Sequence, residues 1–408
     1  MLDKISYKEA FYKIIESIKP TTLKKSVYVD DALGEFLAED IVAKRDAPSF
    51  SNSAMDGFGF KKSENKKLKI IKTIYAGDKF EDFEIKDDEC VKIMTGAKIP
   101  AGIDTVVPIE KCIEVSDKYI VVPEIKKGAN IRVRGEEVKK GDILLKKGIE
   151  ITPEIIALLS SQGIVNVKVY LKPKIAILST GNELKEPWEV ASEDEIYNVN
   201  SYSIKALLKK NGFSADLIGI VPDSLEETIK FIKDLKSKYD VIITTGGISF
   251  GDADFIYEAF LKNGLNPLFR GIMVKPGRPT MVGIMDEVVV FALPGNPLSS
   301  YLNAFALMIP ALRKLSGARE YFYNFVYAKN KSTFRLSPKK DHTILGKFEC
   351  GEWEVYKNYK YGSSMLTALS NSNSLVISSK RDEIKEGEIL KVIPFNIGFC
   401  ESSDFFND

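Results

Sequence analysis

The sequence of 408 residues is 44% hydrophobic and 28% charged, and its 58 lysines and arginines nearly balance its 57 aspartates and glutamates. This length and composition predict roughly two to four soluble domains, and the balanced charge gives no overall attraction for nucleic acid or for an anionic membrane. The 4 cysteines lack CxxC spacing and the 1 histidine cannot build a His-rich metal centre, so we expect neither structural zinc nor disulfides. No apolar run is long enough to cross a bilayer, and we expect a cytoplasmic protein.

The first 45 residues are predicted to be helical. Six apolar residues fall roughly on one helical face, a pattern typical of an amphipathic helix rather than of a signal peptide: Ile5, Ala10, Phe11, Ile14, Ile15 and Ile18. We expect a turn around Pro20 and a second helix that contains residues 29–37.

From residue 41 to residue 124 the pattern indicates a small module made mostly of β-strands. Short β-rich runs alternate there with Gly, Pro and Asp turns. The expected strands are 68–74, 90–93, 105–109 and 119–122. Beyond this module Pro153 opens a predicted helix through Leu159, because proline favours the first helical position, and residues 165–169 are expected to form a strand.

After Pro173 apolar strands and helices alternate regularly. The expected strands cover 175–179, 214–221, 241–245 and 288–293, and the expected helices cover 201–210, 225–236, 255–262 and 298–315. Continuous apolar strands that alternate with helices predict an α/β domain with a doubly wound, largely parallel sheet. Short strands return after about residue 320 and predict a small C-terminal β domain.

Three loops follow predicted strands of this domain, where ligands bind in open α/β sheets. They are residues 179–184 (STGNEL), 244–254 (TTGGISFGDAD) and 293–299 (LPGNPLS). Glycine lets backbone N–H groups approach a ligand such as a phosphate, and the hydroxyl and amide side chains can add to its binding. Each loop alone is equally well explained as a turn or a helix start, with Asn296 as the N-cap and Pro297 as the first helical residue. Three such loops in one domain favour a ligand site.

Between the second and third loops, the segment VKPGRP holds two cations in a stiff frame. Pro276, Gly277 and Pro279 restrict the backbone around Lys275 and Arg278. Fixed cations of this kind suit phosphate or another oxyanion. The alternative is a solvated basic turn.

The β module contributes one acid among small residues. Asp56 stands within SNSAMDGFG, and MTGA (94–97) is a second loop of the same character. An isolated Asp in a glycine-rich loop is usually a turn residue. Together with Glu137, Glu183 and Asp254, however, it offers hard oxygen ligands for Mg²⁺ beside a phosphate.

Taken together, these segments resemble the MoeA family of molybdopterin molybdenumtransferases, which includes the E domain of gephyrin and the plant Cnx protein. Seven segments match in the family's order and span most of the chain. They are SNSAMDGF (51–58), VKIMTGAKIPAGIDTVVPIE (91–110), GANIRVRGEEVKKGD (128–142), PKIAILSTGNEL (173–184), TTGGISFGDAD (244–254), KPGRP (275–279) and LPGNPLS (293–299).

The resemblance implies an α/β multidomain fold and an elongated homodimer of four-domain subunits. Residues 1–45 and 128–170 would form a discontinuous, elongated mixed domain, and residues 46–127 an inserted β module. Residues 171–318 would form a doubly wound α/β/α molybdopterin-binding domain, and residues 319–408 a C-terminal β domain.

The resemblance also implies the chemistry. The enzyme would take adenylylated molybdopterin and molybdate, release AMP and place molybdenum in the dithiolene with the help of Mg²⁺. Family roles make Asp56, Glu183 and Asp254 catalytic, and Glu137, Glu183 and Asp254 the metal ligands. The implied substrate-binding residues are Thr95, Gly96, Thr180, Gly181, Thr245, Gly246, Gly247, Ser249, Lys275, Arg278, Pro294, Gly295, Asn296 and Pro297.

The implied site lies in a cleft that the partner subunit completes, with the β module of one subunit facing the doubly wound domain of the other. An adenylyltransferase and molybdoenzymes that accept the product are the further partners implied. Neither nucleic acid nor a membrane is expected as a partner.

Three places depart from the family's pattern. Gly135-Glu136-Glu137 replaces the usual Gly-Glu-Asp, and Arg278 stands where a lysine is frequent. YGSSML (361–366) resembles the family's glycine–serine motif, but the arginines that the family has upstream are not evident, and His342 and Lys347 are basic residues in that stretch.

Two other functions remain open. One is a molybdopterin adenylyltransferase, an activity that the same type of doubly wound domain carries in some relatives. The other is a scaffold of the gephyrin kind, although the sequence shows no long linker or attached second domain. Consumption of ATP with molybdopterin would indicate the first, and a pull-down of membrane receptors without molybdopterin would indicate the second.

Overall fold

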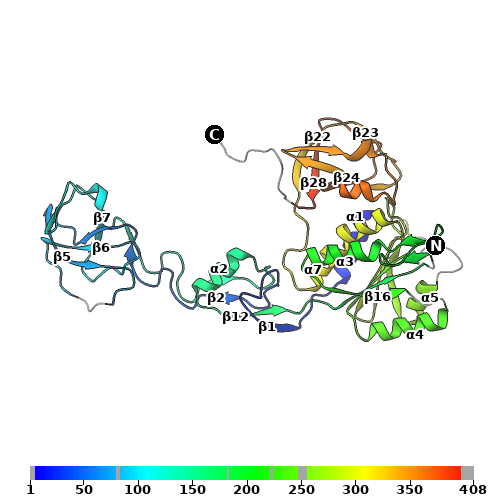
Figure 1. Cartoon of the computed structure of the whole chain (residues 1–408), viewed down its shortest axis with the longest axis horizontal. Coiled ribbons are helices and arrows are strands. Elements are labelled where there is room, and N and C mark those ends of the chain that lie inside the picture. Colours follow the sequence, from blue (N-terminus) through cyan, green and yellow to red (C-terminus); the bar gives the residue numbers. More distant parts are fainter. Residues whose placement is uncertain (1–4, 80–82, 182, 221–223, 247–254, 397–408) are drawn as a thin grey trace.

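The computed structural model describes residues 5–79, 83–181, 183–220, 224–246 and 255–396. The chain is elongated, with a β module at one end, a mixed module in the middle, and the doubly wound and C-terminal β domains together at the other end (Figure 1). Within these ranges no helix has the length and apolar character needed to span a membrane.

The β module is a six-stranded sheet in the order β7-β4-β6-β5-β9-β8. Its core contains Phe58, Leu68 and Cys90, all buried. The strands predicted between residues 68 and 122 are confirmed. The bounds are β4 (Gly57–Phe60), β5 (Lys67–Ile74), β6 (Glu89–Ile93), β7 (Thr105–Pro108), β8 (Glu114–Val115) and β9 (Tyr119–Val121).

The mixed module joins the two ends of the molecule (Figure 1). Antiparallel strand pairs and one helix build it: β1 (Lys24–Tyr28) with β12 (Asn166–Tyr170), β2 (Ile41–Val42) with β11 (Ile143–Leu145), β3 (Asn52–Ser53) with β10 (Ile131–Arg132), and α2 (Pro153–Ser161). The predicted helix at Pro153 is confirmed, and Thr152 caps it by accepting a hydrogen bond from the Ile155 N–H group.

The helix predicted for residues 29–37 is wrong. The segment forms turns after strand β1, and Gly34 adopts a φ of +73° that belongs to a turn rather than to a right-handed helix. Its N–H group donates to the Ile151 carbonyl, and Leu37 pairs with Val169. Apart from the exposed Leu33, the apolar residues of this segment are therefore buried by long-range contacts.

The doubly wound domain contains a six-stranded sheet in the order β16-β13-β17-β21-β20-β18. Strands β13 (Ile175–Ser179), β16 (Ala215–Ile220), β17 (Val241–Thr245) and β21 (Val288–Leu293) are parallel, as predicted. The sequence did not predict the antiparallel edge formed by β18 (Leu265–Arg270) and β20 (Met281–Met285).

Helices cover both faces of this sheet (Figure 1). One face carries α1 (Tyr7–Ser17), α3 (Asn200–Lys210), α6 (Pro297–Asn303) and α7 (Ile309–Leu315), and the other carries α4 (Leu225–Lys236) and α5 (Phe255–Lys262). The N-terminal helix thus packs on the doubly wound domain, whereas β1 belongs to the mixed module. A π-helical turn, Ala304–Met308, separates α6 from α7 where one continuous helix was expected.

The C-terminal β domain has its own core around the buried Trp353. Its main sheet has the order β19-β24-β25-β22-β28-β26, with a further β24–β26 pairing. Because β19 precedes this domain in the chain, the sheet ties KPGRP to the C-terminal domain. The bounds are β19 (Val274–Lys275), β22 (Val326–Asn330), β24 (Asp341–Glu349), β25 (Glu352–Val355), β26 (Ser374–Ser378) and β28 (Ile389–Pro394). The same part of the chain also contains the shorter β23 (Phe334–Arg335), β27 (Glu383–Ile384) and α8 (Leu366–Ser370). Two further short strands, β14 (Leu184–Lys185) and β15 (Ile196–Tyr197), follow β13.

Candidate active site

The three predicted loops meet at the carboxyl ends of the parallel strands. Thr180 donates from its N–H group and its hydroxyl to the Thr245 carbonyl, at 3.3 and 3.4 Å. The Gly246 N–H group donates to the Leu293 carbonyl at 3.1 Å. A Cβ on Gly246 would lie 2.8 Å from the Thr180 hydroxyl, and its φ is +87°, so this close approach requires glycine. The structure therefore brings Thr180, Thr245 and Gly246 together as predicted.

Glu183 lies at the open end of the first loop. Gly181 has a φ of +138°, and a Cβ there would be 2.6 Å from the Glu183 Oε2 atom, so the carboxylate folds back over the glycine. The Glu183 side chain is exposed. A ligand that approaches the strand ends from solvent can therefore reach this carboxylate.

The third loop is fixed from the side by α3. The Asn200 side chain donates to the Gly295 carbonyl at 2.7 Å, and its own buried Oδ1 atom has no hydrogen-bond partner among the described residues. Pro297 is the first residue of α6, as predicted, but the Asn296 side chain forms no capping hydrogen bond. Asn296 and Pro294 line a cavity instead.

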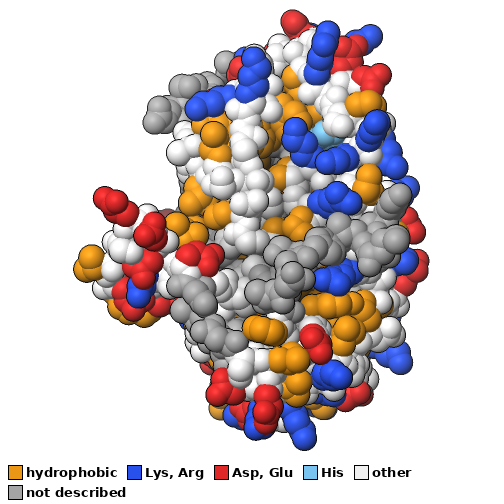
Figure 2. Space-filling model, turned by 90° about the vertical axis from the view of Figure 1, so that its right-hand side faces the viewer, with side chains coloured by type: hydrophobic (Ala, Val, Ile, Leu, Met, Phe, Trp, Pro, Cys, Tyr) orange, Lys and Arg blue, Asp and Glu red, His pale blue; other side chains and the backbone are white. Residues whose placement is uncertain are grey.

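This cavity, of about 310 Å³, lies between the doubly wound and C-terminal domains. Three cations line it, Lys275, Arg278 and Lys340, and none of them forms an ion pair with a described carboxylate. Figure 2 shows lysine and arginine side chains gathered around the chain's single histidine on this face. Unpaired cations around a cavity of this size suit an oxyanion or a phosphate group. The wall is completed by Val274, Pro276, Gly277, Pro279, Pro294, Asn296, Ser299, Tyr359, Tyr361, Gly362 and Ser363.

The KPGRP segment is held rigidly by α6. Gly277 has a φ of +104°, and its carbonyl accepts hydrogen bonds from Asn303 Nδ2 at 3.0 Å and from the Thr280 hydroxyl at 2.8 Å. Asn303 also donates to Thr280 at 2.7 Å, and both side chains are buried. Proline framing suggested this rigidity, but the sequence did not reveal the part of Asn303.

Sequence reasoning missed the contribution of the C-terminal domain to the cavity. Lys340, Tyr359, Tyr361 and Ser363 line it, and the Ser363 carbonyl accepts from the Ser299 N–H group at 3.3 Å. Burial raises the pKa of both tyrosines, which keeps their hydroxyls protonated as donors. The YGSSML motif was the available signal for this wall.

The two basic residues noted upstream of that motif lie in different surroundings. Lys347 pairs with Glu349 at 3.1 Å on the surface and does not line the cavity. His342 is fully buried behind the cavity wall.

The acid of the β module is held in a fixed position. Asp56 Oδ1 accepts hydrogen bonds from the Thr95 N–H group and from its hydroxyl, both at 2.7 Å. These bonds lower the pKa of Asp56, the backbone bond contributing most. Gly96, with a φ of +80°, allows the tight turn that presents Thr95. Oδ2 of Asp56 has no hydrogen-bond partner in the described part of the chain.

Among the described acids, Asp56 and Glu183 do not come together within one chain. Asp56 lies in the β module at one end of the molecule, and Glu183 follows β13 at the other (Figure 1). Glu137 is exposed near Ala47, whose carbonyl accepts its N–H group at 3.0 Å. No group of three or more His, Cys, Asp or Glu residues that could hold a metal occurs in the ranges that the structure describes. Three predicted site residues, Gly247, Ser249 and Asp254, lie outside those ranges.

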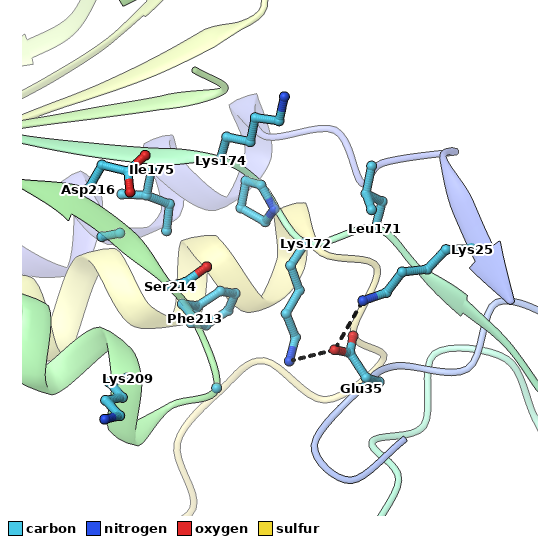
Figure 3. A pocket seen from close by; sticks show the side chains of 13 residues that line it. Lys25, Glu35, Leu171, Lys172, Lys174, Ile175, Lys209, Phe213, Ser214 and Asp216 are labelled. Atoms are coloured by element: carbon cyan, nitrogen blue, oxygen red, sulfur yellow. Dashed lines mark hydrogen bonds and ion pairs between the residues drawn. The ribbon is translucent and has the colours of Figure 1, made fainter. Parts of the chain in front are cut away.

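A larger cavity, of about 450 Å³, lies at the opposite ends of the strands (Figure 3). It borders the starts of β13 and β16, where the sheet meets the mixed module. Glu35 accepts from Lys25 at 3.4 Å and pairs with Lys172 at 3.7 Å, and burial lowers the pKa of Lys172 although Glu35 opposes the shift. Because open α/β sheets bind ligands at the other edge, we assign this cavity to the joint between two modules rather than to the site.

Comparison with protein families gives three consecutive matches. Residues 5–163 match the MoeA N-terminal region (domain I and II), residues 176–314 match a probable molybdopterin binding domain, and residues 327–395 match the MoeA C-terminal region (domain IV).

Curated proteins and solved structures agree with these matches. A molybdopterin molybdenumtransferase of Haemophilus influenzae is 33% identical over 399 residues, which cover 95% of this chain and 98% of that protein. One of Staphylococcus aureus is 36% identical over 334 residues, 79% of each chain. The crystal structure of the molybdopterin biosynthesis moeA protein from Pyrococcus horikoshii OT3 superimposes with a TM-score of 0.84 at 28% identity and covers 96% of this chain and 100% of that one.

Proposed function

The chain belongs to the MoeA family of molybdopterin molybdenumtransferases, and on this premise we propose that it inserts molybdenum from molybdate into adenylylated molybdopterin with release of AMP. It is a transferase of molybdenum cofactor biosynthesis. The observation that carries the proposal is the cavity lined by Lys275, Arg278 and Lys340, which lies beside the glycine loops at the strand ends.

Each part of the site has a task in this reaction. The three cations attract a tetrahedral dianion and hold it by charge-assisted hydrogen bonds. The glycine loops around Thr180 and Gly246 lie at the carboxyl ends of the parallel strands, where the phosphates of the carrier would bind. The dithiolene of the carrier supplies the sulfur ligands for molybdenum, so the reaction requires neither a catalytic thiol nor a catalytic histidine.

The exposed carboxylates fit Mg²⁺, a hard cation that prefers oxygen ligands. Glu183 is open to solvent beside the loops, Glu137 is exposed, and Oδ2 of Asp56 forms no hydrogen bond with any residue that the structure describes. We propose Glu137, Glu183 and Asp254 as its ligands. When bound, Mg²⁺ would neutralise negative charge on phosphate oxygens during release of AMP.

A homodimer would complete the site. Asp56 and Glu183 lie at opposite ends of one elongated chain, so a second subunit is needed to bring them together (Figure 1). Exposed apolar side chains flank both: Phe50 and Met55 lie near Asp56, and Trp188 lies near Glu183 in sequence. Such side chains are typical of protein interfaces. An adenylyltransferase that supplies the carrier and molybdoenzymes that accept the product are the further partners we propose.

The test is to incubate the purified protein with adenylylated molybdopterin, Mg²⁺ and molybdate, and to measure AMP and protein-bound molybdenum. We expect AMP release that depends on molybdate, and its loss in Glu183→Gln. Glu193→Gln, an exposed glutamate in the same connection, is the matched control and should keep full activity. Consumption of ATP with molybdopterin, without molybdate-dependent AMP release, would instead indicate an adenylyltransferase.

A further inference from the structure

The single histidine of the chain is buried directly behind the cation-lined cavity. His342 has no exposed surface, and its Nδ1 atom lies 2.7 Å from the hydroxyl of Tyr359, a residue of the cavity wall. The Tyr359 hydroxyl also donates to the Lys275 carbonyl at 3.2 Å. The Lys275 ammonium lies 5.6 Å from the centre of the Tyr359 ring, within the range of a cation–π contact. Tyr359 therefore touches both the backbone and the charge of Lys275.

The sheet places these residues side by side. Strand β19 pairs in parallel with β24, and in this register Lys275 lies opposite His342. The two residues are 67 positions apart in the sequence. They lie side by side because β19 and β24 belong to one sheet that joins the two domains. The C-terminal domain thus reaches the KPGRP segment through a defined strand pairing.

The segment that presents Tyr359 is strained. Lys357, Asn358 and Tyr359 are consecutive non-glycine residues with φ values of 44°, 49° and 62°. A left-handed conformation is unfavourable for such residues, and runs of it are rare. Strain of this kind persists only where surrounding contacts enforce it, and it concentrates at functional sites. Here it delivers the Tyr359 hydroxyl to His342 and Lys275.

The two neutral tautomers of His342 make different hydrogen bonds. With the proton on Nδ1, the Ser337 N–H group donates to Nε2 at 3.2 Å, Nδ1–H donates to the Tyr359 oxygen, and the Tyr359 hydroxyl donates to the Lys275 carbonyl. With the proton on Nε2, that nitrogen donates to the Ser337 carbonyl at 2.9 Å, and Tyr359 donates to Nδ1 rather than to Lys275. The first arrangement makes three hydrogen bonds and the second two, and only the first keeps the bond from Tyr359 to Lys275, although it leaves the Ser337 carbonyl 2.9 Å from an unprotonated Nε2.

We infer that Tyr359 and His342 are positioning residues that fix Lys275 for binding of the oxyanion, through the directed chain Ser337 to His342 to Tyr359 to Lys275. This inference rests on the proposed function, because it takes molybdate as the ligand of the cavity. Burial lowers the pKa of His342, and a neutral ring is what the chain requires. The Ser337 carbonyl, 2.9 Å from Nε2, opposes this shift because it favours a proton on that nitrogen. Lys275, Lys340 and Asp341 are the charged groups that act on it, the two lysines favouring the neutral ring and Asp341 opposing.

The tautomer can be measured directly, because an untagged protein has only one histidine. Nitrogen NMR of the ¹⁵N-histidine-labelled full chain at neutral pH should show a protonated Nδ1 and an unprotonated Nε2. In Tyr359→Phe the Nδ1 signal should shift, since its acceptor is gone. A protonated Nε2 in the wild type would reverse the chain and overturn the inference.

The consequence for binding is tested with molybdate alone, by calorimetry on the full-length protein. We expect Tyr359→Phe to weaken molybdate binding by roughly five- to tenfold, the effect of one lost hydrogen bond, because it keeps the ring beside Lys275 and removes only the hydroxyl. Tyr356→Phe is the matched control: its hydroxyl has no hydrogen-bond partner in the described part of the chain, and it does not line the cavity. It should bind molybdate as the wild type does.

A double-mutant cycle separates positioning from general packing. His342→Leu should weaken molybdate binding to a similar extent as Tyr359→Phe, and the double variant should be no weaker than either, because both break one chain. His342→Asn retains a donor near Nδ1 and should recover part of the affinity. If His342→Leu does not fold, Tyr359→Phe and His342→Asn still decide the question.

The outcomes distinguish the two proposals. In one outcome the wild type releases AMP with molybdate, while Tyr359→Phe binds molybdate with unchanged affinity but melts at a lower temperature. Tyr359 would then have only a structural role, which would overturn the inference and leave the proposed function intact. A wild type that neither binds molybdate nor releases AMP would overturn the proposed function, and the oxyanion role of Lys275 with it.

Discussion

The carboxylate of Asp56 is held by a single neighbour. Thr95 gives two hydrogen bonds to the same carboxylate oxygen, and both favour the charged form. A carboxylate kept charged in this way remains a ligand or an electrostatic partner at acidic pH. Because its pKa in the folded protein is lowered, its charge is lost only as the pH falls through that depressed value.

Replacing Thr95 by valine should raise the pKa of Asp56. Valine has the shape of threonine without the hydroxyl, so one of the two hydrogen bonds disappears and the backbone bond remains. We expect the acidic limb of the pH–activity profile to move to higher pH, with little change at neutral pH. Titration of the Asp56 carboxyl by NMR in both proteins measures the shift, and identical titration curves would contradict it.

Gly277 is the second residue whose identity has a clear physical cause. Gly277→Ala should destabilise the protein by about 2–4 kcal/mol, because a Cβ would lie 2.4 Å from Asn303 Nδ2 at a φ of +104°. The control is Gly34→Ala, with a φ of +73° and no atom within 4 Å, which should cost only about 1–2 kcal/mol for its backbone. Urea denaturation of both variants gives the comparison. Equal losses would mean that Asn303 can move aside.

Residue patterns predicted the loops of the site better than its walls. The loops at residues 179–184 and 275–279 were predicted from their glycines, hydroxyl side chains and proline-flanked cations. Such loops are recognisable because local chemistry determines them. Tyr359 gave no comparable signal. The position of Tyr359 depends on a left-handed backbone segment and on the β19–β24 pairing, and no local sequence pattern predicts either of them.

At the scale of elements, the parallel strands and their helices were predictable because each buries a continuous or periodic apolar face. The failures have two causes. Residues 29–37 show apolar spacing close to that of a helix, yet long-range hydrogen bonds hold them as turns. The expected helix 298–315 contains a π-helical turn before α7, where Pro310 lacks the N–H group that a regular helix would use.

The joint between the mixed module and the doubly wound domain closes around Phe36. Its ring is buried, with the Lys172 ammonium at 5.7 Å and the Arg313 guanidinium at 5.1 Å from its centre. Each cation also pairs with an acid of the mixed module, Lys172 with Glu35 (Figure 3) and Arg313 with Glu150 at 2.8 Å. Contacts of this kind fix the angle between the modules.

Phe36→Ala should therefore destabilise the protein by about 3–5 kcal/mol, the usual cost of emptying a buried aromatic site. Leu33→Ala, an exposed apolar residue in the same turn, is the control and should change stability by less than about 0.5 kcal/mol. Chemical denaturation measures both. A loss below about 1 kcal/mol for Phe36→Ala would show that the ring is not what holds the joint.

At the scale of the whole molecule, the elongated shape bears on the proposed function. The mixed module keeps the β module far from the doubly wound domain, so Asp56 cannot reach Glu183 of its own chain (Figure 1). A rigid joint would then hold the β module where a partner subunit can use it. In a closed two-fold dimer each site would take one acid from each chain.

This arrangement predicts complementation between two inactive variants. Asp56→Ala and Glu183→Ala proteins should each have little activity, because every site in either homodimer lacks one acid. In a mixed dimer one site combines the intact Glu183 of the first chain with the intact Asp56 of the second, while the other site lacks both. Random pairing of equal amounts should therefore restore about a quarter of the wild-type AMP release, since half of the dimers are mixed and each has one intact site. Co-expression with two different affinity tags isolates the mixed dimer, which should reach about half of the wild-type AMP release because one of its two sites is intact. If it stays inactive while its subunits remain folded and paired, Asp56 and Glu183 do not meet across the dimer.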